Sequence, residues 1–337
     1  MSKRFLAAAC AAATALALSA CSSAPSSEGN ASKDGTLTVM ASFYPLQYLA
    51  EKIGGEHVTV TSLTPAGAEP HDLELSPKTV DALASADAVV YLAGFQAAVD
   101  EAIEQQAPTT VIDVSPVVEL VEANSSANHP SEDEDADEAQ SGESATEEHA
   151  DHDHEGHDHE GHHHDMSADP HFWLDPVRMA SAATLVGDKL AEADPANADT
   201  YKANAQALNE ELSALGDDLV AKTATCQIKT FVTAHTAFGY LADRTGLTQV
   251  GISGLDPDSS PSPARLAEIS QIAKDQGVTT IFTEALIDPK VAQTLADDLG
   301  ISTAVLDPIE SQTDSSKDYA AVMKDNINAL TTANNCQ

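Results

Sequence analysis

Two runs of alternating strand-like and helix-like segments constrain the fold of this 337-residue chain more than any other feature. In the first run, short segments rich in branched apolar residues alternate with segments of helical spacing. The strand-like segments are residues 37–42, 57–63, 88–92 and 110–114. The second run repeats this rhythm from residue 230 to residue 330. Strands and helices that alternate through short links predict parallel sheets covered by helices on both faces.

A long amphipathic segment separates the two runs. From Pro195 to about Thr223, the large apolar residues share one side of a helix: Tyr201, Leu208, Leu212, Leu215 and Leu219. Such a helix would extend for roughly 40 Å, enough to run along two lobes. We therefore predict an α/β fold with two Rossmann-like lobes, residues 36–193 and 225–337, joined by one long rigid helix over residues 194–224.

The N-terminus has the features of an export signal. Lys3 and Arg4 precede an apolar stretch that is too short to span a bilayer. It ends in Leu18-Ser19-Ala20-Cys21, which looks like a lipobox. We expect removal of residues 1–20, lipidation of Cys21 and a flexible tether over residues 21–35, so that the protein is exported and anchored to the extracytoplasmic face of the cell membrane. The alternative is an ordinary cleavage site beside an incidental cysteine.

Export also constrains the other cysteines. Removal of the signal discards Cys10 and lipidation occupies Cys21, which leaves Cys226 and Cys336. Disulfides persist in exported proteins, so this pair predicts a bridge between the C-terminal tail and the start of the second lobe. The alternative is two free thiols.

An acidic, histidine-rich segment interrupts the first lobe. The stretch from His129 to Asp165 holds fifteen acidic residues, nine of the 13 histidines and no Lys or Arg. Because it has almost nothing to bury, we predict a disordered insertion over about residues 123–166. Its histidines are expected to form a weak, multivalent metal collector, and the alternative is a solvated acidic spacer. The histidines concerned are His149, His152, His154, His157, His159, His162, His163 and His164.

The net charge of −38 limits the possible partners. An acidic surface repels nucleic acid and attracts cations. We therefore expect no nucleic-acid binding.

Only four histidines lie outside the insertion, and three of them are in loops rich in Pro, Asp and Gly. His71 follows the second predicted strand, His235 directly follows the strand over residues 230–234, and His171 lies between two Asp-Pro pairs where the first lobe ends. Ligands of open parallel sheets bind beyond the carboxyl ends of the strands. We therefore predict that these three histidines converge between the lobes, where neutral imidazoles favour tetrahedral zinc.

A tetrahedral site needs a fourth ligand, and the strand ends leave three candidates open. Glu310 follows the predicted strand over residues 302–306, Glu284 follows the strand over residues 278–282, and Glu69 lies two residues before His71. A zinc hydrolase could use such a carboxylate as a general base. However, the chain has no His-Glu-x-x-His helix, and loops shared between two lobes suit capture and release better than catalysis. We predict a binding protein and not an enzyme.

The order of these motifs resembles one known family. The lipobox is followed by Glu69-Pro70-His71-Asp72, the acidic His-rich loop, His171-Phe172-Trp173-Leu174-Asp175-Pro176 and Thr233-Ala234-His235. Over nearly the whole mature chain this resembles the zinc-specific solute-binding lipoproteins of ABC importers, the ZnuA/AdcA type of cluster A-I. The resemblance implies that the three histidines bind Zn²⁺. The manganese members of the family usually carry Glu at the position of His235, so a histidine there favours zinc.

The resemblance also ranks the fourth ligand, which in the family is a carboxylate of the C-terminal lobe or a water. By its distance from the chain end, Glu310 matches that carboxylate better than Glu284, and Asp307 is the next alternative. An ABC permease and its ATPase are the implied partners, the linking helix permits only modest closure, and we expect a monomer. The expected function is high-affinity capture of Zn²⁺ for import. The alternatives are a family member for manganese or another divalent metal, a zinc hydrolase, and a surface metal buffer or adhesin without an importer.

Overall fold

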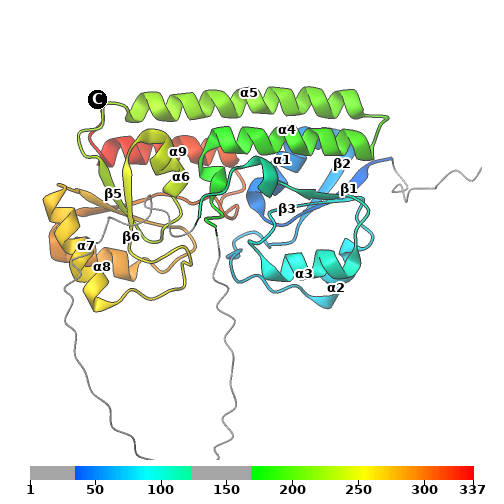
Figure 1. Ribbon diagram of the computed structural model, residues 1–337. Coiled ribbons are helices and arrows are strands. Elements are labelled where there is room, and N and C mark those ends of the chain that lie inside the picture. Colours follow the sequence, from blue (N-terminus) through cyan, green and yellow to red (C-terminus); the bar gives the residue numbers. More distant parts are fainter. Residues whose placement is uncertain (1–34, 123–167) are drawn as a thin grey trace, which may run out of the picture. The chain divides into compact units, whose positions relative to one another are not determined.

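Two four-stranded parallel sheets organise the part of the chain that this computed structural model describes, residues 35–122 and 168–337. The first sheet has the order β2-β1-β3-β4, and the second has the equivalent order β6-β5-β7-β8. The strands are β1 (Leu37–Ala41), β2 (Val58–Ser62), β3 (Ala88–Tyr91), β4 (Val111–Asp113), β5 (Thr230–Thr233), β6 (Thr248–Gly251), β7 (Thr280–Thr283) and β8 (Ser302–Val305). The predicted α/β class with two parallel-sheet lobes is confirmed (Figure 1).

Helices cover both faces of each sheet, as Figure 1 shows. On the first sheet, α1 (Tyr44–Gly54) and α4 (Pro176–Ala193) lie on one face, and α2 (Pro77–Leu83) and α3 (Ala97–Gln106) lie on the other. On the second sheet, α6 (Gly239–Thr245) and α9 (Tyr319–Ala333) lie opposite α7 (Pro263–Asp275) and α8 (Lys290–Leu299). Three short 3-10 helices complete the described elements: η1 (Gly55–His57), η2 (Ser115–Val117) and η3 (Phe172–Leu174).

Successive side chains of the central strands enter different cores, as the pleat of a buried strand requires. In β1, Val39 and Ala41 belong to the largest core cluster, whereas Met40 between them belongs to a smaller cluster under α2 and α3. In β3, Val90 and Val89 divide in the same way. Burial on both faces explains why these strands are continuous apolar runs and not alternating patterns.

The helix starts follow from local sequence. Ser76, Asp175 and Ser262 each precede a proline and accept a hydrogen bond from a backbone N–H of the first turn. Proline is suited to the first helical position because the N–H it lacks would have no partner within the helix. At the other end, α6 and α8 stop at Gly246 and Gly300, which adopt the left-handed conformation that favours glycine.

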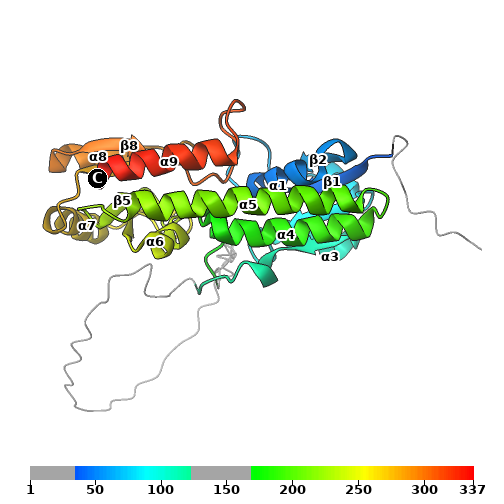
Figure 2. The ribbon, with the colours of Figure 1, turned by 90° about the horizontal axis from the view of Figure 1, so that it is seen from above.

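The long helix α5 (Ala198–Thr223) packs against helices of both lobes. It contacts α1 and α4 of the first lobe and α6 and α9 of the second. Figure 2 shows α4 and α9 running alongside α5 on its two sides. Close approach to α4 requires glycine at residue 187, because a Cβ there would clash with Ala205 of α5. The apolar face predicted for this helix is buried: Tyr201, Leu208, Leu212, Leu215 and Leu219.

One continuous apolar core joins the two lobes. It includes Leu46 and Val90 from the first lobe, Leu212 from α5, and Phe231 and Leu330 from the second lobe. Large apolar contacts of this kind restrict relative motion, whereas small polar contacts permit it. The packing therefore opposes wide opening of the lobes.

A disulfide joins Cys226, just after α5, to Cys336, just after α9. This confirms the predicted pair. It fastens the ends of two helices that lie on the same side of the molecule, and it closes a loop with a sequence separation of 110 residues.

Replacing both cysteines with serine is expected to lower the free energy of unfolding by about 2–4 kcal/mol, because the open chain gains entropy when unfolded. Urea denaturation followed by circular dichroism measures the change. The wild-type protein under reductant is the matched control, and it should unfold at the same urea concentration as the variant. If both samples unfold at the same urea concentration as the oxidised wild-type protein, the bridge contributes nothing to stability.

Several predictions concern residues outside the described ranges. The signal peptide, lipidated Cys21 and most of the tether fall within residues 1–34, and the histidine-rich insertion falls within residues 123–167. Among the helices of the described ranges, none has both the length and the apolar character needed to cross a bilayer.

Candidate metal centre

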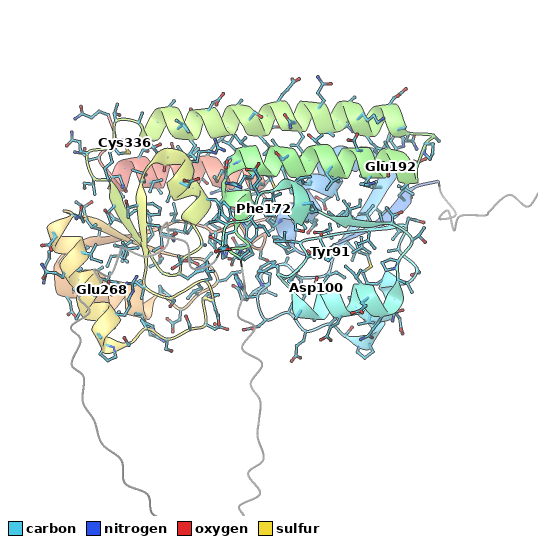
Figure 3. All side chains as sticks on the ribbon, viewed as in Figure 1. Tyr91, Asp100, Phe172, Glu192, Glu268 and Cys336 are labelled. Atoms are coloured by element: carbon cyan, nitrogen blue, oxygen red, sulfur yellow. A yellow bond between two sulfur atoms is a disulfide. The ribbon has the colours of Figure 1, made fainter. Side chains whose placement is uncertain are left out.

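Four side chains from separate segments meet between the sheets. His71 lies in the loop after β2, His171 immediately precedes η3, His235 follows β5 by two residues, and Glu310 follows β8 by five. One potential ligand atom from each lies within 4.8 Å of all the others. Figure 3 shows Phe172, the neighbour of His171, in the region between the two lobes. The structure therefore brings together the three predicted histidines and the first-ranked carboxylate.

The three distances from the Glu310 carboxylate to the imidazoles are close to those between ligands of a single tetrahedral ion. Glu310 Oε1 is 3.0 Å from His171 Nε2, 3.4 Å from His71 Nε2 and 3.3 Å from His235 Nε2. Zinc with bonds of about 2.0–2.1 Å sets its tetrahedral ligands about 3.3–3.4 Å apart. The four atoms all lie within 4.8 Å of one another, so one ion could contact all of them once the ligands close around it.

Burial makes this arrangement unfavourable without a positive charge inside it. The side chains of His171 and His235 are 0% exposed, and that of Glu310 is 1% exposed. His235 Nε2 has no hydrogen-bond partner among the described residues, although Glu310 Oε1 is close. Lone pairs of an imidazole nitrogen and a carboxylate repel each other at this separation unless a proton or a cation lies between them.

Two further carboxylates orient the imidazoles. Asp169 Oδ1 is 2.8 Å from His171 Nδ1, and Glu284 Oε2 is 2.6 Å from His235 Nδ1. Both carboxylates also accept the backbone N–H of the same histidine. A carboxylate at Nδ1 favours the proton there, which leaves the Nε2 lone pair free to face the centre. The ring tautomer that a metal requires is therefore already selected.

His71 is held through its loop. The side-chain amide of Gln96 donates to the carbonyl of Pro70 and to the hydroxyl of Thr64, both at 3.0 Å. The Phe95 ring packs edge-on against the His71 ring, with centroids 4.9 Å apart. The side chain of His71 is 6% exposed, which makes it the most accessible member of the cluster. The centre is therefore closest to the surface at His71.

The Glu310 segment, which belongs to the second lobe, is fixed by contacts with the first lobe. The indole N–H of Trp173 donates to the carbonyl of Pro308 at 2.7 Å. The hydroxyl of Ser311 accepts the backbone N–H of Gly67 at 2.7 Å. Ile309 adopts a left-handed backbone with φ of 58°, a strained conformation for a β-branched residue. This turn directs Glu310 back towards the histidines.

The local charges shift the pKa values of the cluster in opposite directions. Burial alone would lower the pKa of His171, but its hydrogen bonds to Asp169 and Glu310 outweigh burial and raise it. Burial likewise opposes protonation of His235, and the charge of Glu284 raises its pKa well above the ordinary value. Burial lowers the pKa of His71. Burial would raise the pKa of Glu310, but the three imidazoles that surround its carboxylate hold it well below its usual range.

The alternative ligands occupy different positions. Glu284 lies behind His235, with both of its oxygens engaged by that residue. Asp307 accepts the backbone N–H of Ile309. Glu69 lies beside the cluster, 4.0 Å from His71 Nε2, and burial together with the charge of Glu310 raises its pKa to about 8. Of these carboxylates, only Glu310 joins the four-residue group.

Sequence reasoning did not find the orienting roles of Asp169 and Glu284. Asp169 lies two residues before His171, a spacing at which a carboxylate often accepts a nearby N–H. Glu284 directly follows β7, which neighbours β5, so the sheet order brings it to His235. The role of Asp169 could have been found from its spacing to His171. The role of Glu284 could be found only by knowing the order of the strands.

Comparison with known proteins places this centre in a family. The family model described as zinc-uptake complex component A, periplasmic, matches residues 39–333. The chain belongs to the ZnuA family. Two curated relatives that are similar to this chain carry names that match this family. The high-affinity zinc uptake system protein ZnuA of Bacillus subtilis is 32% identical over 323 residues, which cover 94% of this chain and 93% of the relative.

The zinc-binding protein AdcA of Streptococcus pyogenes serotype M3 is 33% identical over 312 residues. The match covers 88% of this chain, which spans only 56% of the length of that relative. A solved structure of the Zn(II)-bound ZnuA-like domain of Streptococcus pneumoniae AdcA superposes with a TM-score of 0.68 at 29% identity, and covers 89% of this chain and 99% of that domain. The resemblance to the family deduced from the motifs is thereby confirmed, and it includes the two-lobed fold.

Proposed function

We propose that this protein is the extracytoplasmic zinc-binding component of an ABC-type zinc importer. In this proposal His71, His171, His235 and Glu310 capture Zn²⁺ as cargo, and the loaded protein delivers it to a membrane permease. The observation that carries the proposal is the set of 3.0–3.4 Å distances between one buried carboxylate oxygen and three imidazole Nε2 atoms. The names of the relatives, which refer to zinc binding and zinc uptake, support the same metal.

The ligand chemistry favours zinc over manganese. Three neutral imidazoles and one carboxylate suit zinc, whereas manganese prefers a sphere richer in oxygen. His235 is the residue that makes the set nitrogen-rich, and Glu284 holds its ring in place. The alternative function for this centre is that of a carrier of manganese or another divalent metal within the same family. Titration of the metal-free protein with zinc and manganese in competition distinguishes the two.

The closed ligand set favours transport over catalysis. A catalytic zinc keeps one position open for water or substrate, and a site with four protein ligands does not. Glu310 occupies the position that a zinc hydrolase would need to leave open. We therefore propose that the protein is not an enzyme.

The remaining parts of the proposal concern partners and location. We propose that the loaded protein, a monomer, docks on an ABC permease with its ATPase and is anchored to the membrane by a lipid on Cys21. The histidine-rich stretch between residues 129 and 165 would act as an accessory collector of zinc. Its fifteen acidic residues and nine histidines supply weak ligands in large number.

Zinc uptake by cells that lack the gene tests this function. Uptake of radioactive zinc from a zinc-depleted medium should fall on deletion and be restored by the wild-type chain. The His171→Ala variant should not restore uptake. The matched control is His57→Ala, since His57 lies in η1, outside the four-residue group. Equal uptake with and without the gene would overturn the transport assignment and favour a metal buffer or an adhesin.

Glu284 is expected to act on zinc through His235. Replacing Glu284 with glutamine should lower the zinc affinity by about 10–100-fold, the usual effect of losing a carboxylate behind a histidine ligand. Both oxygens of Glu284 accept hydrogen bonds from His235, and an amide can accept only one of them. Competition with a chromophoric chelator measures the change. Glu268→Gln, on the exposed side of α7, is the control and should bind like the wild type (Figure 3).

A further inference from the structure

Helix α6 connects two of the metal-binding segments. It begins four residues after His235 and presents Tyr240 and Arg244 to the segment that carries His171. Residues four apart lie on the same side of a helix, so both side chains reach the same neighbour. That neighbour is the stretch from Asp169 to Asp175, which belongs to the other lobe.

Tyr240 holds the beginning of this stretch. Its hydroxyl donates to the carbonyl of Asp169 at 2.7 Å and accepts the backbone N–H of Val121 at 2.9 Å. The Asp169 carboxylate in turn orients His171 through Nδ1. Tyr240 is 2% exposed, so no water competes freely for these hydrogen bonds. The Tyr240 hydroxyl therefore holds Asp169 in place, and Asp169 in turn orients the imidazole of His171.

Arg244 holds the end of the same stretch. Its guanidinium makes a two-point contact with the buried Asp175, with Nη2 at 2.7 Å from Oδ2 and Nε against Oδ1. Asp175 also caps α4 by accepting the backbone N–H of Val177. Arg178 approaches the same carboxylate at 3.5 Å, and its guanidinium lies over the Tyr240 ring, 4.8 Å from the centroid. The two holding points thus belong to one connected cluster.

We infer that Tyr240 and Arg244 are positioning residues that clamp the His171 segment at both ends and so tie it to His235. The inference rests on the proposed zinc site. In the metal-free protein, loss of a holding point lets the segment adopt positions in which His171 Nε2 no longer faces the other ligands. Apparent affinity then falls in proportion to the fraction of molecules that remain competent to bind.

The first test compares single variants with matched controls. Tyr240→Phe keeps the ring and removes only the hydroxyl, and Arg244→Gln removes the two-point contact. Each should lower the zinc affinity by about 3–10-fold, the effect of losing one or two buried hydrogen bonds. The controls are Tyr48→Phe, whose buried hydroxyl has no hydrogen-bond partner within the described ranges, and Arg265→Gln, whose side chain bonds to Glu268 and to the Gly251 carbonyl. Both should bind zinc as tightly as the wild type.

The second test separates positioning from general stability. In a His171→Ala background, Tyr240→Phe should change the remaining zinc affinity by less than about two-fold, because the residue it positions is absent. The loss of unfolding free energy caused by Tyr240→Phe, measured with urea in the metal-free protein, should be the same in both backgrounds.

Each outcome has a distinct meaning. If His171→Ala itself leaves zinc binding unchanged, the proposed zinc site fails. Suppose that His171→Ala weakens zinc binding. If Tyr240→Phe then has no effect, or weakens binding equally with and without His171, the clamp is wrong and the zinc site stands. Should Arg244→Gln prove too unstable to purify, Tyr240→Phe alone decides the question.

Discussion

Replacing His171 with alanine is expected to lower the zinc affinity by about 100-fold or more. Four-ligand zinc sites are worth about 10–16 kcal/mol, so one ligand of four supplies about 3 kcal/mol. His171 is enclosed and its Nε2 lies 3.0 Å from Glu310 Oε1, so its loss leaves one position of the four-residue group without its ligand. Titration of the metal-free protein against a competing chelator measures the change.

The matched control for this loss is another histidine. His57→Ala removes an imidazole from η1 and should leave zinc affinity unchanged. Circular dichroism of both variants should match the wild type, which separates ligand loss from misfolding. Retention of wild-type affinity by His171→Ala would exclude His171 from the ligand set.

Acidification from about pH 7.5 to about pH 5.5 is expected to weaken zinc binding on the order of 10³-fold. Only neutral imidazoles bind the metal, so protons stabilise the metal-free protein alone and affinity must fall as the pH falls. The pKa values of His171 and His235 are raised by Asp169, Glu284 and Glu310. Competition by protons therefore begins above pH 6.5, the ordinary value for histidine. His71, whose pKa is lowered by burial, contributes only at more acidic pH.

Proton release during zinc binding measures this linkage. Calorimetric titrations in buffers of different ionisation enthalpy should show proton release that increases as the pH falls through the raised pKa values. Each protonated imidazole that must lose its proton lowers the zinc affinity by up to about 10-fold per pH unit, so two of them lower it by up to about 100-fold. The His171→Ala variant should show a shallower dependence because one of the competing protons is gone. A zinc affinity that is the same at both ends of the range would contradict binding by three histidines.

Much of the fold could be predicted because its signals are local. Branched apolar runs mark the buried strands, and Ser-Pro or Asp-Pro pairs mark helix starts, such as the start of α7 at Pro263. The meeting of His71 and His235 followed from the rule that ligands bind beyond strand ends, and His171 was placed with them because it lies where the first lobe ends. That rule works here because the strands of each sheet are parallel, so their carboxyl ends lie at the same edge.

The position of the carboxylates depended on information that spacing does not contain. Glu284 directly follows β7 and reaches only the far side of His235. Glu310 lies farther beyond β8, in a segment turned by the left-handed backbone of Ile309. No sequence pattern indicates that an isoleucine adopts this conformation, because contacts such as that of Trp173 with Pro308 impose it.

The clamp from α6 could not be predicted for a related reason. Tyr240 and Asp169 are separated by 71 residues, and Arg244 and Asp175 by 69. Each of these four residues is ordinary in its own segment. Tyr240 and Arg244 lie on a helix, and Asp169 and Asp175 each precede a proline. Their pairing becomes visible only when the two lobes are placed together.

A crystal structure of the zinc-loaded protein tests the central claim most directly. We predict one zinc ion bound by Nε2 of His71, His171 and His235 at about 2.0–2.1 Å and by a Glu310 oxygen at about 2.0–2.2 Å. Asp169 and Glu284 should remain on the Nδ1 atoms of His171 and His235. A tight zinc ion bound elsewhere, or bound here with any of the three imidazoles turned away from it, would contradict the account.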